Sequence, residues 1–123
     1  HVPDLIGALI EMMRVVRDGG ILFHIVPKRG ALPADAHRPI STADNFNKAY
    51  TQKWTPETIP ADVVEAAGGA RGHIWVFNLN SLKEAVRIAA QHAGGEVEVI
   101  AEEDSDTKVS NGHMLAVRIH KPK

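Results

Sequence analysis

The stretch Arg17-Asp18-Gly19-Gly20-Ile21-Leu22-Phe23-His24-Ile25-Val26 contains the signal on which the fold prediction depends. Before it, between residues 3 and 17, apolar residues recur at the spacing of one helical face. The two glycines suit the left-handed turn that ends many helices, and an apolar run follows. Such a run is typical of a strand buried on both faces in a parallel sheet covered by helices. The stretch predicts a helix, a tight turn and a buried strand in an α/β domain. The predicted inner face of the helix comprises Leu5, Ile6, Leu9, Met12, Met13 and Val16.

The last third of the chain predicts another helix followed by two strands. Ser81 and Glu84 have the spacing of a capping box, and apolar residues then follow at helical spacing as far as Gly94. Residues 96–103 and 113–120 alternate between apolar and polar, as half-buried strands do; Val97, Val99 and Ala101 are predicted to share one side. The polar link between them suits antiparallel neighbours. We expect a small mixed sheet, its last strand antiparallel, flanked by helices.

Residues 27–72 interrupt the regular pattern with five prolines. Ser41 or Thr42 is suited to cap one short helix, and residues 60–67 to form another. Long excursions with small helices of their own are commonly lids or binding elements. We therefore predict a lid or acceptor-binding excursion within a single domain that spans residues 1–123.

Composition excludes several classes of function. The 14 basic and 15 acidic residues give a net charge of −1, so the sequence offers no electrostatic footprint for nucleic acid or a membrane surface. There is no cysteine, no bilayer-length apolar run and no signal peptide, which together predict a cytoplasmic location. None of the seven histidines has the helical spacing and partner carboxylate of a metal site, so no metal is expected.

The order of elements resembles the second half of class I S-adenosylmethionine-dependent methyltransferases. In that family a seventh strand runs antiparallel between the fifth and sixth strands. Residues 1–4 (His-Val-Pro-Asp), Ala8-Leu9, residues 17–23 and Val26-Pro27 look like the stretch that follows the cofactor site. Residues 37–42 (His-Arg-Pro-Ile-Ser-Thr), Tyr50 and residues 73–75 (His-Ile-Trp) are similar to bacterial methyltransferase-domain proteins. The resemblance implies a partial Rossmann-like fold whose cofactor is S-adenosylmethionine.

Two departures from the family pattern limit what this chain is expected to do alone. Family members carry an acidic residue and a histidine where this chain has Asp44-Asn45. The strand leading into Gly-x-Gly-x-Gly, which binds the cofactor, is missing, as is the acidic residue that ends the next strand. We therefore expect the C-terminal, substrate-side part of an enzyme, cut or produced apart from its N-terminal half and inactive by itself.

The resemblance implies roles for a few residues. His1 would lie near the methionine end of the cofactor, unless it is simply a solvated terminus. His37 and Arg38 would bind the methyl acceptor, an unidentified small molecule or glycan, unless they are exposed loop charges. Thr42 would lie with them, and His73 and Trp75 would form an acceptor wall, with core packing the alternative for Trp75. No catalytic residue is predicted.

The remaining histidines are assigned no function. His24 is expected to be a hydrogen-bonded core residue, and His92, His113 and His120 to lie at the surface or at strand ends. A second hypothesis makes the chain a non-catalytic interaction or structural module that forms a homodimer through its sheet edge. The first hypothesis predicts association with an N-terminal half instead.

Overall fold

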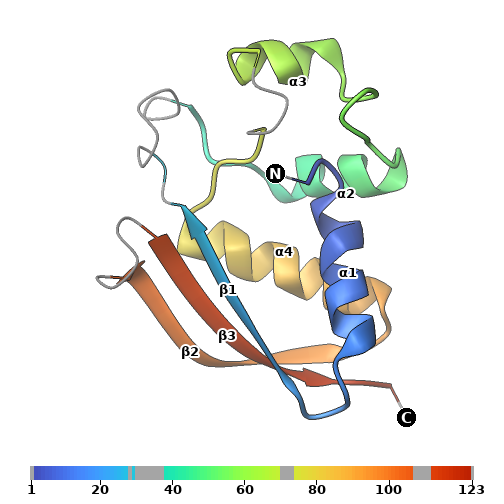
Figure 1. Cartoon of the computed structure of the whole chain (residues 1–123), viewed down its shortest axis with the longest axis vertical. Coiled ribbons are helices and arrows are strands. Elements are labelled where there is room, and N and C mark those ends of the chain that lie inside the picture. The colour runs from blue at the N-terminus through green and yellow to red at the C-terminus, as the bar shows by residue number, and fades with distance from the viewer. Residues whose placement is uncertain (1, 28, 30–37, 70–73, 107–111, 123) are drawn as a thin grey trace.

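The computed structural model of this chain describes residues 2–27, 29, 38–69, 74–106 and 112–122 (Figure 1). Helices and strands follow one another in the order helix, strand, three helices, two strands. Their bounds are α1 Leu5–Val15, β1 Ile21–Pro27, α2 Ala43–Thr51, α3 Ala61–Ala66, α4 Leu79–His92, β2 Glu96–Asp106 and β3 Gly112–His120. The predicted order of elements is confirmed, including the two short helices inside residues 27–72.

The three strands form one open sheet in the order β1-β3-β2, and β3 pairs antiparallel with both neighbours. The last strand thus lies in the middle and runs against the other two, as expected. The prediction of a mixed sheet was wrong for the described strands, because β1 and β2 run in the same direction but do not pair. Every hydrogen-bonded pair in this sheet is antiparallel.

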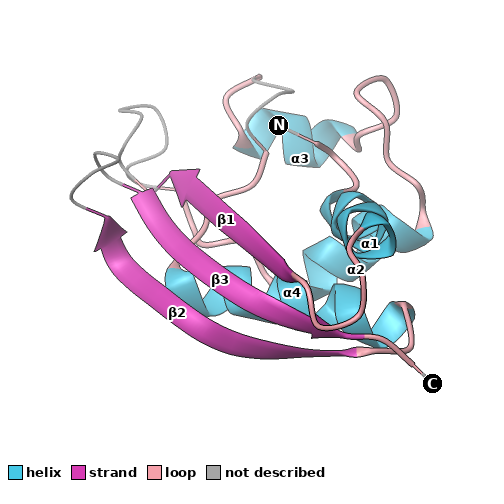
Figure 2. Ribbon diagram, turned by 60° about the horizontal axis from the view of Figure 1, so that its bottom comes forward, coloured by secondary structure: helices cyan, strands magenta, loops and turns pink. Residues whose placement is uncertain are grey.

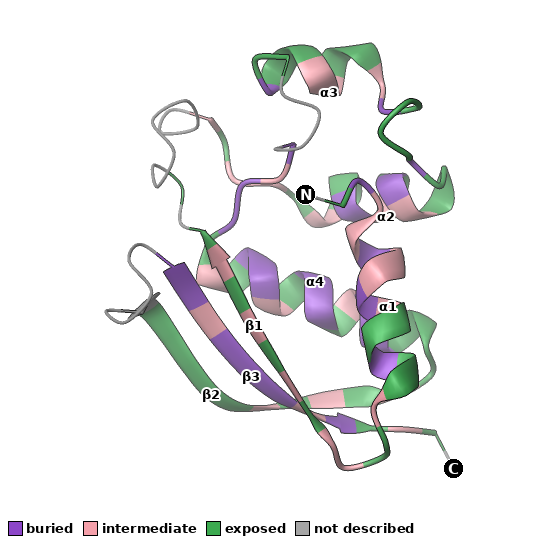
Figure 3. Cartoon of the chain, viewed as in Figure 1, coloured by how far each residue is buried: buried purple, intermediate pink, exposed green. Residues whose placement is uncertain are grey.

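Strand β1 lies at the edge of the sheet, not in its middle. Ile21, Phe23 and Ile25 are 52%, 59% and 40% exposed, while Leu22 and Val26 pack against the core. The alternation arises because α1, α2 and α4 all lie on one face of the sheet (Figure 2), and the outer face of β1 is open (Figure 3). The prediction of a strand buried on both faces was therefore wrong, since an apolar run does not show which faces are covered.

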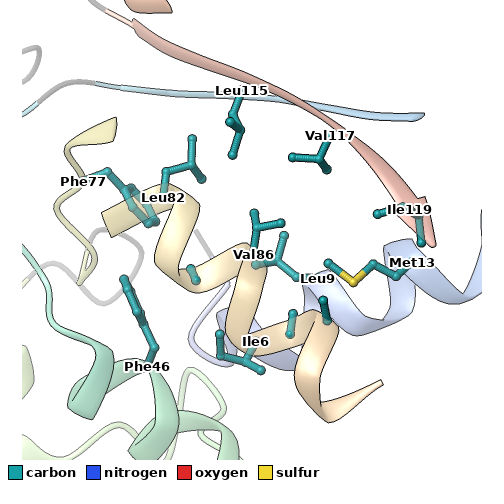
Figure 4. Packing of buried hydrophobic residues seen from close by; sticks show 13 residues of the cluster. Ile6, Leu9, Met13, Phe46, Phe77, Leu82, Val86, Leu115, Val117 and Ile119 are labelled. Carbon is teal, nitrogen blue, oxygen red and sulfur yellow. The ribbon is translucent and has the colours of Figure 1, made fainter. Parts of the chain in front are cut away.

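The core lies between β3 and the helices α1 and α4 (Figure 4). Leu115 and Val117 of β3 are completely buried, and each such side chain contributes roughly 1.5–3 kcal/mol by leaving water. From α1 and α4 they meet Ile6, Leu9, Met13, Leu82 and Val86. Met12 was predicted to belong to this face but is 43% exposed. Among the described helices and strands, α1 has its main contacts with α4 and α2.

A second cluster joins α2 to α3. It consists of Ala49, Trp54, Ile59, Ala67 and Ile74, with Trp75 packed against both this cluster and the main core. The predicted cap of α2 is confirmed, because the Thr42 Oγ1 accepts a hydrogen bond from the Asn45 backbone N–H at 3.3 Å. The described residues between Ala49 and Ile74 therefore pack onto the domain through Trp75.

The N-cap of α4 lies three residues before the predicted cap, Ser81. Asn78 is the N-cap, and its Oδ1 accepts from the Ser81 N–H at 2.7 Å. The Ser81 Oγ returns the interaction by accepting from the Asn78 N–H at 2.9 Å, which completes a capping box. The predicted box between Ser81 and Glu84 was wrong because Ser81 is itself the third helical residue.

A β-bulge changes the face of β2 partway along its length. Val97 and Val99 pack against the core as predicted, but the register shifts between Val99 and Ala101. After the bulge Glu102 turns toward α4, where its Oε2 lies 3.0 Å from the Lys83 Nζ. Ala101 therefore does not lie on the same face of β2 as Val97 and Val99, where the alternation predicted it.

None of the helices in the described ranges is both long and apolar enough to cross a membrane.

Candidate functional site

Two segments that are far apart in the sequence lie side by side and bring two helix starts together. The Ser41 backbone N–H donates to the Val76 carbonyl at 2.8 Å, and the Val76 N–H donates to the Ser41 Oγ at 2.8 Å. Each segment leads directly into a helix cap, Thr42 for α2 and Asn78 for α4. Because the segments are hydrogen-bonded, the two helix N-termini are held next to each other.

An open cavity of about 490 Å³ lies between these helix starts. Its lining includes the polar residues Thr42, Asp44, Asn78, Asn80, Ser81 and Glu84, together with Ile40 and Ala43. Asn78 and Ser81 are occupied with capping α4, whereas Asp44, Asn80 and Glu84 are exposed. Carboxylates accept hydrogen bonds from hydroxyl groups, and amides both donate and accept them. The cavity is therefore suited to a small ligand that carries several hydroxyl groups.

Arg38, predicted to bind the acceptor, helps to hold the two segments together. Its Nη2 donates to the carbonyl of Ile74 at 3.0 Å, and the side chain is half-buried. The reading of Arg38 as an exposed loop charge was therefore wrong.

Trp75 is packed between the two hydrophobic clusters. Its ring stacks on Trp54 with a centroid distance of 6.0 Å and an interplanar angle of 6°, and it lies 5.1 Å from the ring of Phe46. Its Nε1 donates to the Val2 carbonyl at 2.9 Å, which ties the segment before α4 to the start of the chain. The core-packing alternative is confirmed for this residue.

Three of the predicted site residues, His1, His37 and His73, lie outside the described residues. Thr42 lines the cavity between α2 and α4, and its role in acceptor binding stays a prediction. Sequence reasoning missed Asp44, Asn80 and Glu84. The signal in the sequence was the cap at Asn78, because a cap there places Asn80 and Glu84 in the first two turns of α4. The structure shows that these turns lie next to the start of α2.

The described residues near the chain start are bonded to other parts of this chain. Near the chain start, where the resemblance places the cofactor, the Asp4 Oδ1 accepts from the Gly7 N–H at 2.9 Å and caps α1. The Val2 carbonyl accepts the bond from Trp75. None of the described strands leads into a glycine-rich turn that could hold the cofactor.

The histidines of the sheet differ from expectation. His24 is half-buried on the inner face of β1, its Nε2 has no hydrogen-bond partner, and burial lowers its pKa. The expected hydrogen bond is absent at this atom. His113 is only 5% exposed and not a surface residue. Its Nδ1 lies 3.3 Å from the Asp104 Oδ1 but without the alignment of a hydrogen bond.

The other two histidines have partners at the surface. The ring of His92 lies 4.6 Å from that of Tyr50, and the His120 Nε2 is 3.1 Å from the Glu98 Oε1. Within the described ranges no three histidine, aspartate or glutamate side chains come close enough to hold a metal ion.

Comparisons of this chain with protein-family models, with curated proteins and with solved structures found no match.

Proposed function

We propose that this chain is the substrate-side half of a class I S-adenosylmethionine-dependent methyltransferase, with a partial Rossmann-like sheet. The observation that carries the proposal is the strand order β1-β3-β2, with the last strand inserted antiparallel between two strands that run in the same direction. A simple three-stranded meander would instead pair its strands in chain order. The crossover through α4 therefore supports the resemblance seen in the sequence.

The open side of β1 supports the same proposal. Its free edge and its exposed Ile21, Phe23 and Ile25 are suited to a neighbouring strand and a covering layer. In the proposed enzyme the N-terminal half supplies both, along with the cofactor site. The cofactor, when bound there, supplies the methyl group.

This chain supplies the acceptor side of the reaction. The cavity between α2 and α4 binds a polyhydroxylated small molecule or glycan through Thr42 and Asn80. Asp44 and Glu84 orient its hydroxyl groups, and one of these carboxylates accepts the proton released from the reacting oxygen. The same carboxylates and the net charge of −1 disfavour nucleic acid as the acceptor. We place the enzyme in the cytoplasm, since the sequence has no cysteine.

The experiment measures transfer of a labelled methyl group by the complete product of the gene, with a panel of monosaccharides and methyl glycosides as acceptors. The Asp44→Asn and Glu84→Gln variants are compared with Glu65→Gln, an exposed glutamate of α3. We expect at least one cavity variant to lose tenfold or more in kcat/KM for the acceptor, and Glu65→Gln to match the wild type. Equal activity of all three variants would contradict the assignment of the cavity.

A second candidate function is a self-associating interaction module. It is favoured by the same exposed apolar residues of β1, which could pair with β1 of a second copy. The paired region in such a dimer would be short, because the seven residues of β1 span only about 23 Å. A stable interface buries roughly 800 Å² on each partner, so the dimer would also need contacts outside the paired strands. Sedimentation equilibrium distinguishes the two candidates. A dimer that Phe23→Lys dissociates would favour the module, and a monomer would favour the methyltransferase half.

A further inference from the structure

A separate apolar pocket lies at the opposite end of α4 from the acceptor cavity. It has a volume of about 360 Å³ and is formed where α1, α4 and the end of β3 converge. Figure 1 shows the carboxyl ends of both helices and the C-terminus at this end of the molecule. A helix the length of α4 extends about 21 Å, so the pocket and the acceptor cavity are distinct.

The floor of this pocket is apolar. Met13 and Ile119 are buried there, and they lie at the same end of the core in Figure 4. Ile10 and Ala90 add further apolar surface, and Ala93 lies on the exposed side. A concave apolar surface of this size is within the range of small-molecule sites.

The mouth of the pocket carries two cations held in place by the fold. The Lys121 Nζ donates to the Arg14 carbonyl at 3.0 Å, and its backbone N–H donates to the Asp18 Oδ1 at 2.8 Å. The Arg14 Nε donates to the Glu11 Oε2 at 2.6 Å. An ammonium has three donors and a guanidinium five, so both groups retain N–H donors for a ligand. Among the described residues that line the pocket, Glu96 is the single carboxylate.

We infer that this pocket binds a medium-chain aliphatic carboxylate, with its chain on the apolar floor and its carboxylate at Lys121 and Arg14. The Lys121 ammonium at the mouth favours an anion, with a smaller contribution from Arg14, whose guanidinium is paired with Glu11, and the apolar floor favours an unsubstituted chain. The pocket volume of about 360 Å³ is that of roughly twelve water molecules in the liquid. A ligand of about ten non-hydrogen atoms, such as octanoate, is therefore of the right size. The inference is independent of the methyltransferase proposal, because it uses none of the same residues.

The test is a titration of the ¹⁵N-labelled chain with sodium octanoate, followed by amide chemical shifts, with octan-1-ol and acetate as comparison ligands. Three variants accompany the wild type. Lys121→Gln removes a charge at the mouth, and Ala93→Trp fills the pocket from its exposed rim. Lys48→Gln removes an exposed lysine of α2 and serves as the control.

We expect saturable shifts at Met13, Gly95 and Ile119 with octanoate and none with acetate. Lys121→Gln should weaken octanoate binding about tenfold, the effect of losing one charge-assisted contact. Ala93→Trp should abolish it, and Lys48→Gln should leave it unchanged. The inference is overturned if these amides do not shift, if Lys121→Gln binds octanoate as the wild type does, or if octan-1-ol binds equally well.

Discussion

Phe46→Ala is predicted to cost roughly 3–5 kcal/mol of the free energy of unfolding. The ring of Phe46 has no exposed surface, lies 5.1 Å from that of Trp75 and 6.1 Å from that of Phe77, and belongs to the main core. Its removal deletes a buried aromatic side chain and leaves a cavity that the surrounding helices fill only in part, which explains the predicted range. Because small domains have only about 5–15 kcal/mol of stability, the variant should be close to unfolding at room temperature.

The assay is urea unfolding followed by tryptophan fluorescence, because Trp75 contacts Phe46 directly. The matched control is Phe23→Ala, the same substitution at a residue that is 59% exposed on the open face of β1. We expect the control to cost about 1 kcal/mol or less, since little surface leaves water at that position. A Phe46→Ala variant that loses no more stability than Phe23→Ala would refute the description of the core.

Three further predictions concern a histidine, a cap and a glycine. Burial lowers the pKa of His24 from its ordinary value of 6.5. Below about pH 6.5 the unfolded chain therefore binds more protons than the folded protein does, so the contribution of the neutral His24 to the free energy of unfolding falls on acidification. His24→Leu should therefore lose less stability than the wild type between about pH 7.5 and 5.5, measured by urea midpoints. Asn78→Ala should cost about 1 kcal/mol through loss of the capping box, whereas Asn80→Ala should cost less than half of that; equal costs would argue against the cap. Gly95→Ala would place a Cβ 2.6 Å from the His120 carbonyl oxygen, and we expect a loss of about 1–3 kcal/mol in thermal or urea unfolding.

The sequence was sufficient to predict the elements because each has a strong local signal. Asp18-Gly19-Gly20 separates α1 from β1, and Gly19 does adopt a positive φ of 80°. The cap at Thr42 was also predictable, since hydroxyl side chains satisfy the free N–H groups at a helix start.

The sequence failed where the outcome depends on distant parts of the chain. An apolar run such as Ile21–Val26 is compatible with either one or two covered faces, and only the packed structure shows that the outer face of β1 is open. The bulge after Val99 coincides with a break in the alternation at Ile100, but two adjacent apolar residues in a strand do not by themselves indicate a bulge. Ser81 was mistaken for the cap because both Asn78 and Ser81 are good capping residues.

The candidate site was predicted less completely than the fold. Thr42 was predicted as a helix cap, but Asp44 and Glu84 join it in one cavity only because the segments at Ser41 and Val76 are hydrogen-bonded across 35 positions of sequence. Periodicity and capping patterns act over a few residues and contain no information on such a contact.

The most direct test of the proposed function is calorimetric titration of S-adenosylmethionine into the complete product of the gene, compared with the 123-residue chain alone. We predict saturable binding to the complete product and none to the chain, because the sequence of the chain lacks the Gly-x-Gly-x-Gly motif of the proposed family. A complete product that does not bind S-adenosylmethionine would contradict the methyltransferase assignment.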